Sequence, residues 1–199
     1  MYDDNITKKI CLFLKKKIDY IFVDTEKKAA LDKKTGTINI ERVVRENFEL
    51  DKIFYFKAND LTVEAASNFL EMLFQKDIRN ISNKKILIIG AGNIGFKLGL
   101  KLIERGVKVF LNGKTDESTN RLISVINRIK PNATLNKDKN FSNIKKDFSK
   151  FDIIVNASNS QNIIFKKKDL LFKQNIIFLE IGKNLFSREA LNKYIENNI

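Results

Sequence analysis

The sequence predicts an α/β protein with a C-terminal Rossmann-type doubly wound parallel sheet and a smaller N-terminal α/β domain. Three observations support this fold class. A short apolar run at 84–89 leads into a G-x-G-x-x-G turn, an amphipathic segment follows at 93–105, and strand-like and helix-like segments then alternate to the C-terminus. A buried strand, a glycine turn and a helix in this order form the first βα unit of such a sheet.

The glycine turn is Gly90-Ala91-Gly92-Asn93-Ile94-Gly95, and each glycine has a distinct expected role. Gly90 permits a tight turn, Gly92 lets the backbone approach a pyrophosphate, and Gly95 lets the helix pack closely on the strand. The N–H groups and the positive dipole end of the first helical turn would receive the phosphates. We therefore predict that these six residues bind a dinucleotide. The alternative is a glycine-rich turn that serves packing alone.

The rest of the C-terminal part continues the alternation, and residues 83–199 are predicted to form one dinucleotide-binding domain. Gly106 stands where a helix C-cap belongs, and Ser187 is expected to cap the last helix. Strands are predicted at 107–111, 133–135, 151–156 and 175–180, and helices at 117–130, 167–172 and 187–197.

Residues 1–80 are predicted to form a separate small α/β domain, as a substrate or dimerisation unit. No Pro- or Gly-rich linker follows it, so we expect the two parts to pack closely and to form a cleft between them. Strands are predicted at 20–23 and 52–57, and a helix at 40–48. Two helices have predicted apolar faces: Ile6, Ile10, Phe13 and Leu14 in the first, and Leu61, Ala65, Phe69, Met72 and Leu73 in a helix at 61–75 that Thr62 or Asp60 would cap.

Composition excludes several kinds of site. The chain has 199 residues, no histidine and one cysteine, Cys11, so a Ser-His triad, a His-ligated zinc and a cysteine-based metal site are ruled out and no metal is predicted. Cys11 lies in an apolar helix and is expected to be a core residue. The net charge is +13, but the lysine clusters are short and scattered, which favours solvated faces over a specific nucleic-acid groove.

The sequence contains no apolar run of membrane length and no signal-peptide stretch at its N-terminus. We therefore expect no membrane interaction and a cytoplasmic location. The positive charge would still attract anionic substrates or cofactors.

The segment after the second strand of the domain bears on the choice of cofactor. NAD-specific domains carry an acidic residue there that holds the ribose 2′-hydroxyl. Here the strand ends in Asn112-Gly113-Lys114-Thr115, without an acid. Lys114 as a point charge and Thr115 as a hydroxyl donor suit a 2′-phosphate, so we predict NADP, with NAD as the alternative. An Asn-Gly turn with a solvated lysine would have the same sequence.

These features together resemble a known superfamily. The helix at 61–75, the connector at 81–85, the glycine turn, the Asn-x-x-Thr that begins at Asn112, and the run from Asp152 to Ser158 are similar to the NADP-binding domains of shikimate dehydrogenase, methylenetetrahydrofolate dehydrogenase and glutamyl-tRNA reductase. The resemblance spans about residues 60–182. It implies that Asn156, Ala157 and Ser158 run beside the cofactor near the nicotinamide, and that Glu180 to Lys183 line the cleft.

The first 80 residues do not carry the substrate motifs of these families, so the substrate is not identified. Without histidine, a proton must come from Lys, Tyr, Asp, Glu or water. The candidate catalytic residues are Lys57, Asp60 and Lys183, with Asn59 and Glu180 beside them. The leading hypothesis is an NADP-dependent oxidoreductase that acts on a small, anionic metabolite in biosynthesis. The alternative is a non-catalytic dinucleotide-binding sensor or subunit, and a homodimer is compatible with so short a chain.

Overall fold

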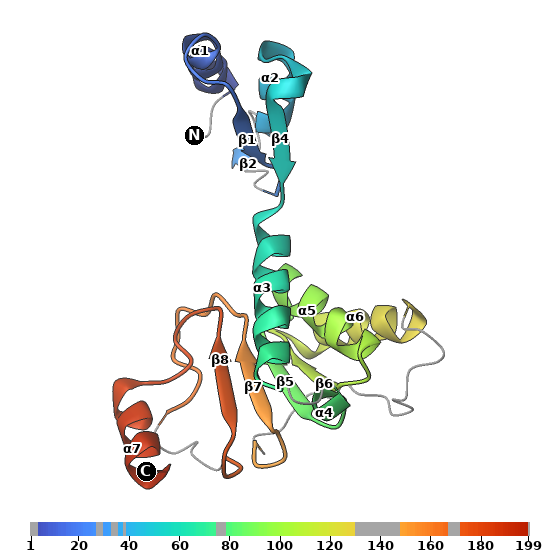
Figure 1. Ribbon diagram of the computed structural model, residues 1–199. Helices are drawn as coiled ribbons and strands as arrows, with labels where there is room; N and C mark the ends of the chain where they lie inside the picture. Colours follow the sequence, from blue (N-terminus) through green and yellow to red (C-terminus); the bar gives the residue numbers. More distant parts are fainter. Residues whose placement is uncertain are drawn as a thin grey trace. The chain divides into compact units, whose positions relative to one another are not determined.

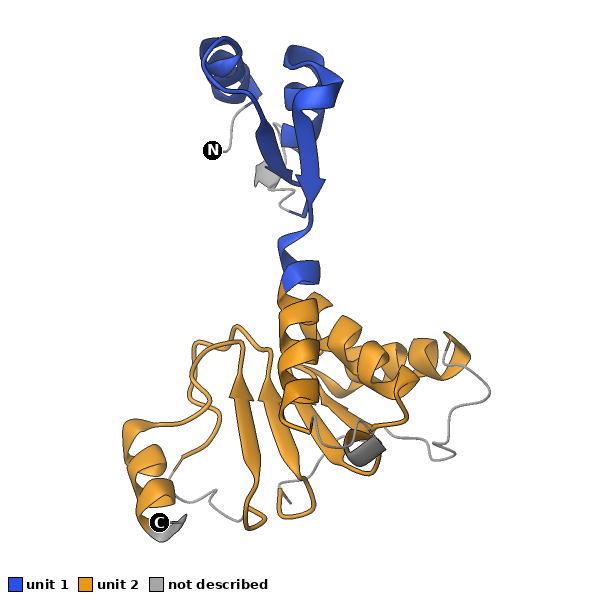
Figure 2. Ribbon diagram, viewed as in Figure 1, with its two compact units in different colours: residues 1–61 blue, residues 62–199 orange. Residues whose placement is uncertain are grey.

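A computed structural model of the protein describes residues 4–26, 30–32, 36–37, 39–74, 79–129, 148–166 and 172–198. The chain divides into two units, residues 1–61 and 62–199 (Figure 2). This boundary falls inside one continuous helix, α3 (Ala58–Met72), whereas the sequence suggested a boundary at 80–83. A continuous helix has no linker composition, so the sequence does not mark the division.

The second unit contains a four-stranded sheet in which every neighbouring pair is parallel (Figure 1). Its strand order is β6-β5-β7-β8, and Ile88 in β5 lies between Leu111 in β6 and Val155 in β7. The α/β class with a parallel Rossmann-type sheet is thereby confirmed. The strands are β5 (Lys85–Ile89), β6 (Lys108–Asn112), β7 (Ile153–Asn156) and β8 (Ile177–Glu180).

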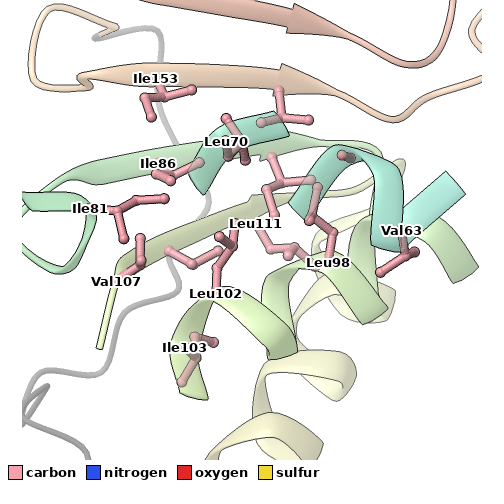
Figure 3. Close-up of a cluster of buried hydrophobic side chains, with 14 of the residues drawn as sticks. Val63, Leu70, Ile81, Ile86, Leu98, Leu102, Ile103, Val107, Leu111 and Ile153 are labelled. Atoms are coloured by element: carbon pink, nitrogen blue, oxygen red, sulfur yellow. The ribbon is translucent and has the colours of Figure 1, made fainter. Parts of the chain in front are cut away.

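One face of this sheet is covered by α3, α5 (Asn93–Glu104) and α6 (Asp116–Ile129). Leu70 of α3, Leu98 and Leu102 of α5, and Ile86 of β5 are fully buried in one hydrophobic cluster (Figure 3). Burial on both faces explains why the strands are continuous apolar runs and do not alternate. A short helix, α4 (Arg79–Ser82), precedes β5.

The opposite face is covered mainly by aromatic side chains. Leu87, Ile89 and Ile154 of the sheet pack with buried Phe151 and Phe165. Further aromatic residues surround this cluster, and in one of them, Tyr194 of α7 (Arg188–Asn198), burial raises the pKa of the phenol. The Ala190 N–H donates to Ser187 Oγ at 3.1 Å, which confirms Ser187 as the cap of this helix. Two predicted elements, a strand at 133–135 and most of a helix at 167–172, lie outside the described residues.

The first unit is a small α/β unit whose core contains Cys11, Val23, Val44, Phe48 and Ile53. Burial raises the pKa of the Cys11 thiol. Two of its strands, β1 and β4, pair in parallel, and β2 pairs with β3 antiparallel. The elements are α1 (Asp4–Leu14), β1 (Ile21–Asp24), β2 (Ala30–Asp32), β3 (Gly36–Thr37), α2 (Ile40–Asn47), the 3₁₀ helix η1 (Leu50–Lys52) and β4 (Ile53–Phe56).

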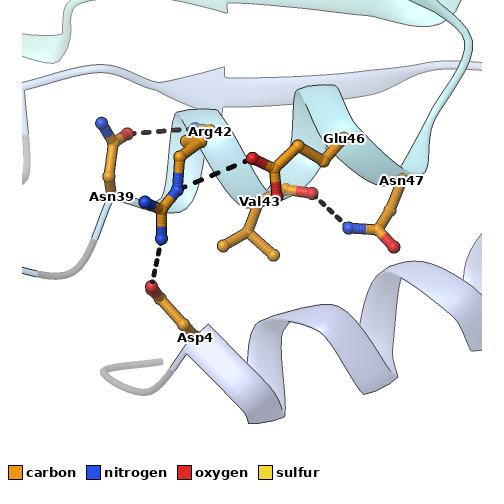
Figure 4. A network of polar contacts seen from close by, with 6 residues as sticks. All are labelled: Asp4, Asn39, Arg42, Val43, Glu46 and Asn47. Atoms are coloured by element: carbon orange, nitrogen blue, oxygen red, sulfur yellow. Dashed lines mark hydrogen bonds and ion pairs between the residues drawn. The ribbon is translucent and has the colours of Figure 1, made fainter.

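Polar contacts fix α2 and join it to α1 (Figure 4). The Asn39 side chain caps α2 by accepting from the Arg42 N–H at 3.0 Å, and the Asn47 amide donates to the Val43 carbonyl at 2.7 Å. The Arg42 guanidinium also donates to Asp4 Oδ2 at 3.0 Å. Arg42 is half exposed, so this link orients the two helices and adds little stability.

The apolar faces predicted for two helices are not the faces that the structure buries most deeply. In α1, Ile6 and Phe13 are 52% and 63% exposed, while Thr7 and Cys11 are buried. In α3 the helix buries Val63, Ala66, Ser67 and Leu70, and the predicted face of Leu61, Ala65, Phe69, Met72 and Leu73 is exposed. The sequence of α3 has apolar residues on two faces, and periodicity alone does not determine which one meets the sheet.

The start of α3 also differs from the prediction. The helix begins at Ala58, so Asp60 and Thr62 lie inside it and not at its cap. The Asn59 N–H donates to the Glu26 carboxylate at 2.9 Å, and this acceptor satisfies part of the first turn. Glu26 is distant in sequence, so no local pattern identifies it.

Candidate functional site

The glycine turn after β5 begins with a sharp change of direction at Gly90. Its φ is +102°, a value that residues with a side chain rarely adopt. A Cβ at this position would lie 2.6 Å from the Ser158 backbone nitrogen. Gly90 is therefore required both by the turn and by the close approach of the chain after β7, as the sequence suggested for the first glycine.

Gly92 and Gly95 have opposite surroundings. A Cβ on Gly95 would lie 1.9 Å from the Gly90 carbonyl oxygen, so helix α5 can sit this close to β5 only without a side chain there. A Cβ on Gly92 would meet nothing within 4 Å. Gly92 is the N-cap of α5 and has no side-chain cap, although its carbonyl accepts from the Phe96 N–H at 2.9 Å.

This geometry fits a phosphate group. The first-turn N–H groups of an α-helix have no carbonyl partner within the helix, and the helix dipole attracts negative charge to the same end. At α5 the backbone of Gly92 borders open space at this end. The turn can therefore receive a pyrophosphate, with Ala91, Gly92 and Asn93 as the residues next to it.

The end of β6 lies directly against the glycine turn. The Gly90 N–H donates to the Asn112 carbonyl at 2.7 Å. A Cβ on Gly113 would lie 3.1 Å from that of Ala91 and 2.4 Å from Thr119 Oγ1, and the Gly113 N–H donates to that hydroxyl at 3.1 Å. The structure thus brings the predicted phosphate turn and the predicted ribose segment together.

Lys114 and Thr115 follow Gly113 in the chain. Of the two side chains, that of Thr115 takes part in hydrogen bonds that cap α6. Lys114 is exposed. The Thr115 hydroxyl accepts from the Ser118 N–H at 3.3 Å and donates to the Ser118 hydroxyl at 2.8 Å, which makes Thr115 the cap of α6. Its carbonyl also accepts from buried Thr119. Thr115 has a structural function here, and its contact with a cofactor stays a prediction.

Asn156, at the end of β7, is fully buried and hydrogen-bonded. Its Oδ1 accepts from the Ser158 N–H at 3.0 Å and from the Ser158 hydroxyl at 2.8 Å. Its Nδ2 donates to the Lys183 carbonyl at 3.0 Å and to the Glu180 carboxylate at 3.4 Å. The Asn156 side chain therefore joins the ends of β7 and β8, and the cofactor contact predicted for it stays a prediction.

The chain after β8 lies closely against the chain after β7. The Lys183 N–H donates to the Ser158 carbonyl at 3.1 Å, and the Ala157 N–H donates to the Ile89 carbonyl at 2.7 Å. A Cβ on Gly182 would lie 2.0 Å from that Ser158 carbonyl oxygen. The structure thus gathers the turn at 90–95, Ala157, Ser158 and the exposed Lys183 at the carboxyl edge of one sheet.

The other two catalytic candidates belong to the first unit. Lys57 is exposed, and its carbonyl accepts from the N–H groups of Asp60 and Leu61 at 3.1 and 3.3 Å. Asp60 is half-buried in the first turn of α3. Both residues therefore lie at the start of α3, where their observed contacts belong to the first helical turn. Their catalytic role stays a prediction.

Two structural roles near this site were not predicted from the sequence, one at Thr119 and one at Glu180, which the sequence suggested only as a catalytic candidate and as part of the cleft lining. Buried Thr119 supports Gly113 at the end of β6, and Glu180 accepts from the Leu185 N–H at 2.9 Å, which shapes the loop after β8. For Thr119, the only local signal in the sequence is its position one helical turn after Thr115, and this signal is weak. The role of Glu180 depends on the conformation of the loop after β8, in which Asn184 has a φ of +61°. Sequence spacing does not predict this conformation.

The described part of the chain contains neither a candidate metal site nor a candidate membrane-spanning helix. Within these residues, no group of three or more Cys, Asp or Glu side chains could hold a metal ion. No helix among them is long and apolar enough to cross a membrane.

The family model for shikimate / quinate 5-dehydrogenase matches residues 72–181, which is more than half of the chain. The chain belongs to this family. The matched residues contain β5, the glycine turn, α5, and the ends of β6, β7 and β8. The matched residues therefore include the site as far as Ile181, and the predicted resemblance is confirmed.

Curated relatives extend the comparison to the glutamyl-tRNA reductases. The enzyme of Thermosipho melanesiensis is 26% identical over 118 residues, which cover 58% of this chain and 29% of that protein. The enzyme of Methanococcus maripaludis strain S2 is 28% identical over 144 residues, which cover 72% of this chain and 35% of that protein. The chain thus spans about a third of the length of these relatives.

Among solved structures, a dipicolinate synthase subunit from Bacillus subtilis is similar with a TM-score of 0.49 and 16% identity. The similarity covers 80% of this protein and 50% of that subunit. A D-lactate dehydrogenase from Lactobacillus jensenii is similar with a TM-score of 0.45 and 17% identity, over 98% of this protein and 59% of the dehydrogenase.

Proposed function

We propose that the protein is an NADP-dependent oxidoreductase that reduces or oxidises a small, anionic metabolite. The observation that carries the proposal is the N-terminus of α5, where Gly92 borders open space and Gly90 lies against the end of β6 and the chain after β7. Membership of the shikimate / quinate 5-dehydrogenase family supports the same proposal. The dinucleotide would supply the chemistry of hydride transfer, and the protein would bind and orient it.

The preference for NADP rests on the residues at the end of β6. Asn112 occupies the place where an acidic side chain would hold the 2′-hydroxyl of NAD, and a carboxylate there would repel a 2′-phosphate. Lys114 is exposed two residues further on and offers a positive charge. Thr115 is committed to capping α6, so the proposal assigns recognition of the 2′-phosphate to Lys114.

For the chemical step, Lys183 is the candidate with the strongest structural support. Its backbone is held by the ends of β7 and β8, and its side chain is exposed at the carboxyl edge of the sheet. Ligands of open α/β sheets bind beyond this edge. We propose that Lys183 binds an anionic group of the substrate or delivers a proton to it. The predictions that Lys57 and Asp60 act in catalysis, and that the substrate binds in a cleft between the two parts of the chain, are retained as proposals.

The substrate class follows from charge and from the relatives. A net charge of +13 raises the local concentration of anions around the protein. Relatives named glutamyl-tRNA reductase support a role in biosynthesis. We propose a small carbonyl or imine compound with a carboxylate or phosphate group as the substrate.

The second candidate is a non-catalytic dinucleotide-binding protein. The chain spans about a third of the length of its curated relatives, and their remaining residues have no counterpart in this match. Binding of NADPH without turnover of any carbonyl or imine substrate would favour this candidate. NADPH oxidation that depends on such a substrate would favour the enzyme.

Binding of the cofactor can be tested by titration with NADPH and NADH while nicotinamide fluorescence is followed. We expect NADPH to bind more tightly, and Lys114→Glu to weaken NADPH by about tenfold or more while it leaves NADH nearly unchanged, because a charge-assisted contact is worth about 1.5–3 kcal/mol. Lys193→Glu, on exposed α7, makes the same change of charge away from β6 and serves as the control. Equal losses for both cofactors, or no binding at millimolar concentration, would contradict the proposal.

A further inference from the structure

The Ser158 hydroxyl, just after β7, has its only proton engaged in the structure. It donates to Asn156 Oδ1 at 2.8 Å, and the Ser158 N–H donates to the same oxygen at 3.0 Å. A hydroxyl group has one proton and two acceptor lone pairs, so a serine that donates to Asn156 can only accept from a further group. Ser158 is half-buried, and within the described part of the chain no group donates to its hydroxyl oxygen.

The orientation of the Asn156 amide determines the direction of this hydrogen bond. Asn156 is fully buried, and its Nδ2 donates to the Lys183 carbonyl at 3.0 Å and to Glu180 Oε1 at 3.4 Å. A carbonyl and a carboxylate accept, whereas the Ser158 N–H on the other side of the amide donates. A rotated amide would place oxygen against oxygen and N–H against N–H in a buried position, which is costly. The Asn156 oxygen therefore faces Ser158, and the hydroxyl must donate to it.

The backbone around Ser158 is fixed beside the glycine turn. A Cβ on Gly90 would lie 2.6 Å from the Ser158 nitrogen. The Ala157 N–H donates to the Ile89 carbonyl at 2.7 Å, and the Ser158 carbonyl accepts from the Lys183 N–H at 3.1 Å. The acceptor lone pairs of Ser158 are thus held next to the turn that is proposed to bind the pyrophosphate.

The strand order indicates which part of a dinucleotide Ser158 would meet. The chain passes from β5 to β6 on one side of β5 and returns to β7 on the other side. A dinucleotide binds across the carboxyl edge of the sheet where the strand order reverses in this way. The segment proposed for the adenosine ribose follows β6, so the other nucleoside would lie over the end of β7, beside Ser158.

We propose that Asn156 is a positioning residue that holds the Ser158 hydroxyl as a hydrogen-bond acceptor for the nicotinamide nucleoside of the cofactor. The group that Ser158 binds is a donor, either a ribose hydroxyl or the carboxamide N–H. Phosphate oxygens accept hydrogen bonds, so Ser158 does not bind the pyrophosphate, which is left to the N–H groups of the glycine turn. This inference rests on the proposed binding of a dinucleotide and does not require turnover.

The test is calorimetric titration of the full chain with NADP, with its 3-acetylpyridine analogue, which lacks the carboxamide N–H, and with adenosine 2′,5′-bisphosphate, which lacks the nicotinamide nucleoside. Ser158→Ala should weaken NADP binding by about fivefold or more, because the ligand donor loses its acceptor. It should leave the affinity for adenosine 2′,5′-bisphosphate unchanged, which a general disturbance of the site would not do. Ser158→Thr keeps the hydroxyl and should retain most of the affinity for NADP.

Ser160→Ala is the matched control in the same loop. The Ser160 hydroxyl donates to the Asn162 carbonyl at 2.8 Å and accepts from the Asn162 N–H at 3.1 Å, so both of its roles are used within the loop. This variant should bind all three ligands as the wild type does.

Asn156→Ala tests the positioning role. It should weaken NADP and not adenosine 2′,5′-bisphosphate, and in combination with Ser158→Ala it should add no further loss, because Asn156 acts through Ser158. Circular dichroism checks that the variants fold, and Asn156→Ser replaces Asn156→Ala if the latter does not.

The acetylpyridine analogue distinguishes the two donors. If Ser158→Ala weakens the analogue as much as NADP, the donor is a ribose hydroxyl, and a loss confined to NADP identifies the carboxamide. Unchanged binding of NADP by Ser158→Ala, an equal loss for adenosine 2′,5′-bisphosphate, or additive losses for the two changes would overturn the inference. A wild type that binds none of the three ligands would instead overturn the proposed function, and the inference with it.

Discussion

Gly92 and Gly95 belong to the same turn, but a methyl group would have very different consequences at each. At Gly95 it would meet the Gly90 carbonyl oxygen at 1.9 Å and the Ile88 side chain at 3.2 Å. At Gly92, with φ −77°, it would meet open space. Gly95 is needed for packing of α5 on β5, and Gly92 leaves room for a ligand.

We expect Gly95→Ala to lower the free energy of unfolding by about 2 kcal/mol or more, since α5 must move away from β5. Gly92→Ala should change it by less than about 1 kcal/mol and should weaken NADPH binding, because the methyl group enters the space proposed for the pyrophosphate. Urea unfolding and nicotinamide fluorescence measure the two effects. Equal unfolding midpoints for the two variants would contradict the assignment of packing to Gly95.

Single residues also mark the limit of sequence reasoning at the turn. The pattern G-x-G-x-x-G correctly gave Gly90 a turn role and Gly95 a packing role, because both follow from the backbone of a strand–turn–helix unit. The capping of α6 by Thr115 and the burial of Asn156 were not foreseen, since each depends on contacts that form only when neighbouring loops meet.

Among the elements, β7 is joined to β5 and to a distant loop through Asp152. The Lys85 N–H donates to Asp152 Oδ2 at 2.8 Å, and Lys173 forms an ion pair with Oδ1 at 2.5 Å. Burial raises the pKa of the Asp152 carboxyl, but the hydrogen bonds from Lys173 and the Lys85 N–H outweigh it, so the pKa is lowered. The ionised carboxylate therefore stabilises the fold.

Asp152→Asn should reduce the free energy of unfolding by about 1 kcal/mol at pH 7, because the charge that faces Lys173 is lost. The contribution of Asp152 is fully present above the ordinary aspartate pKa of about 3.9 and is lost as the pH falls through the lower folded-state pKa. Urea unfolding at pH 7 and near pH 3 should show a smaller difference between wild type and variant at the lower pH. A difference that stays constant would mean that the ionised state of Asp152 is not stabilising.

The sequence predicted which helices and strands form, and in which order, better than it predicted which side of a helix is buried. The strands β5 to β8 and the helices α5 to α7 are found close to their predicted ranges, because short apolar runs, glycine turns and caps are local signals. The apolar face predicted for α3 is not the one that meets the sheet, because α3 has apolar residues on two sides. Contact with Leu98 and Ile86 selects the side that carries Val63 and Leu70.

At the scale of the whole molecule, the hydrophobic cores of the two units share no residue among those described. The second unit has two large clusters on the two faces of its sheet, whereas the first unit has one small cluster around Cys11. Small cores give marginal stability. The sequence predicted two parts, but their boundary lies within continuous α3, so no linker composition marks its position.

We expect the first unit to unfold at a lower urea concentration than the second. Cys11 is 2% exposed and burial raises its thiol pKa, so a thiol reagent should react slowly with the native protein and rapidly once the first unit opens. Thiol reactivity should therefore rise before the loss of nicotinamide-binding capacity, which reports the second unit. Coincident transitions would mean that the chain unfolds as one cooperative unit.

The contacts among Asn156, Ser158 and Gly182 have a consequence for protein engineering. Asn156 holds both ends together, and Gly182 leaves no space for a side chain beside the Ser158 carbonyl. If the loop after β7 were replaced by that of a relative, its atoms would not match the loop after β8, which packs closely against the native one. The two loops can therefore be exchanged between relatives only as a pair, and a graft of either one alone is expected to disrupt both.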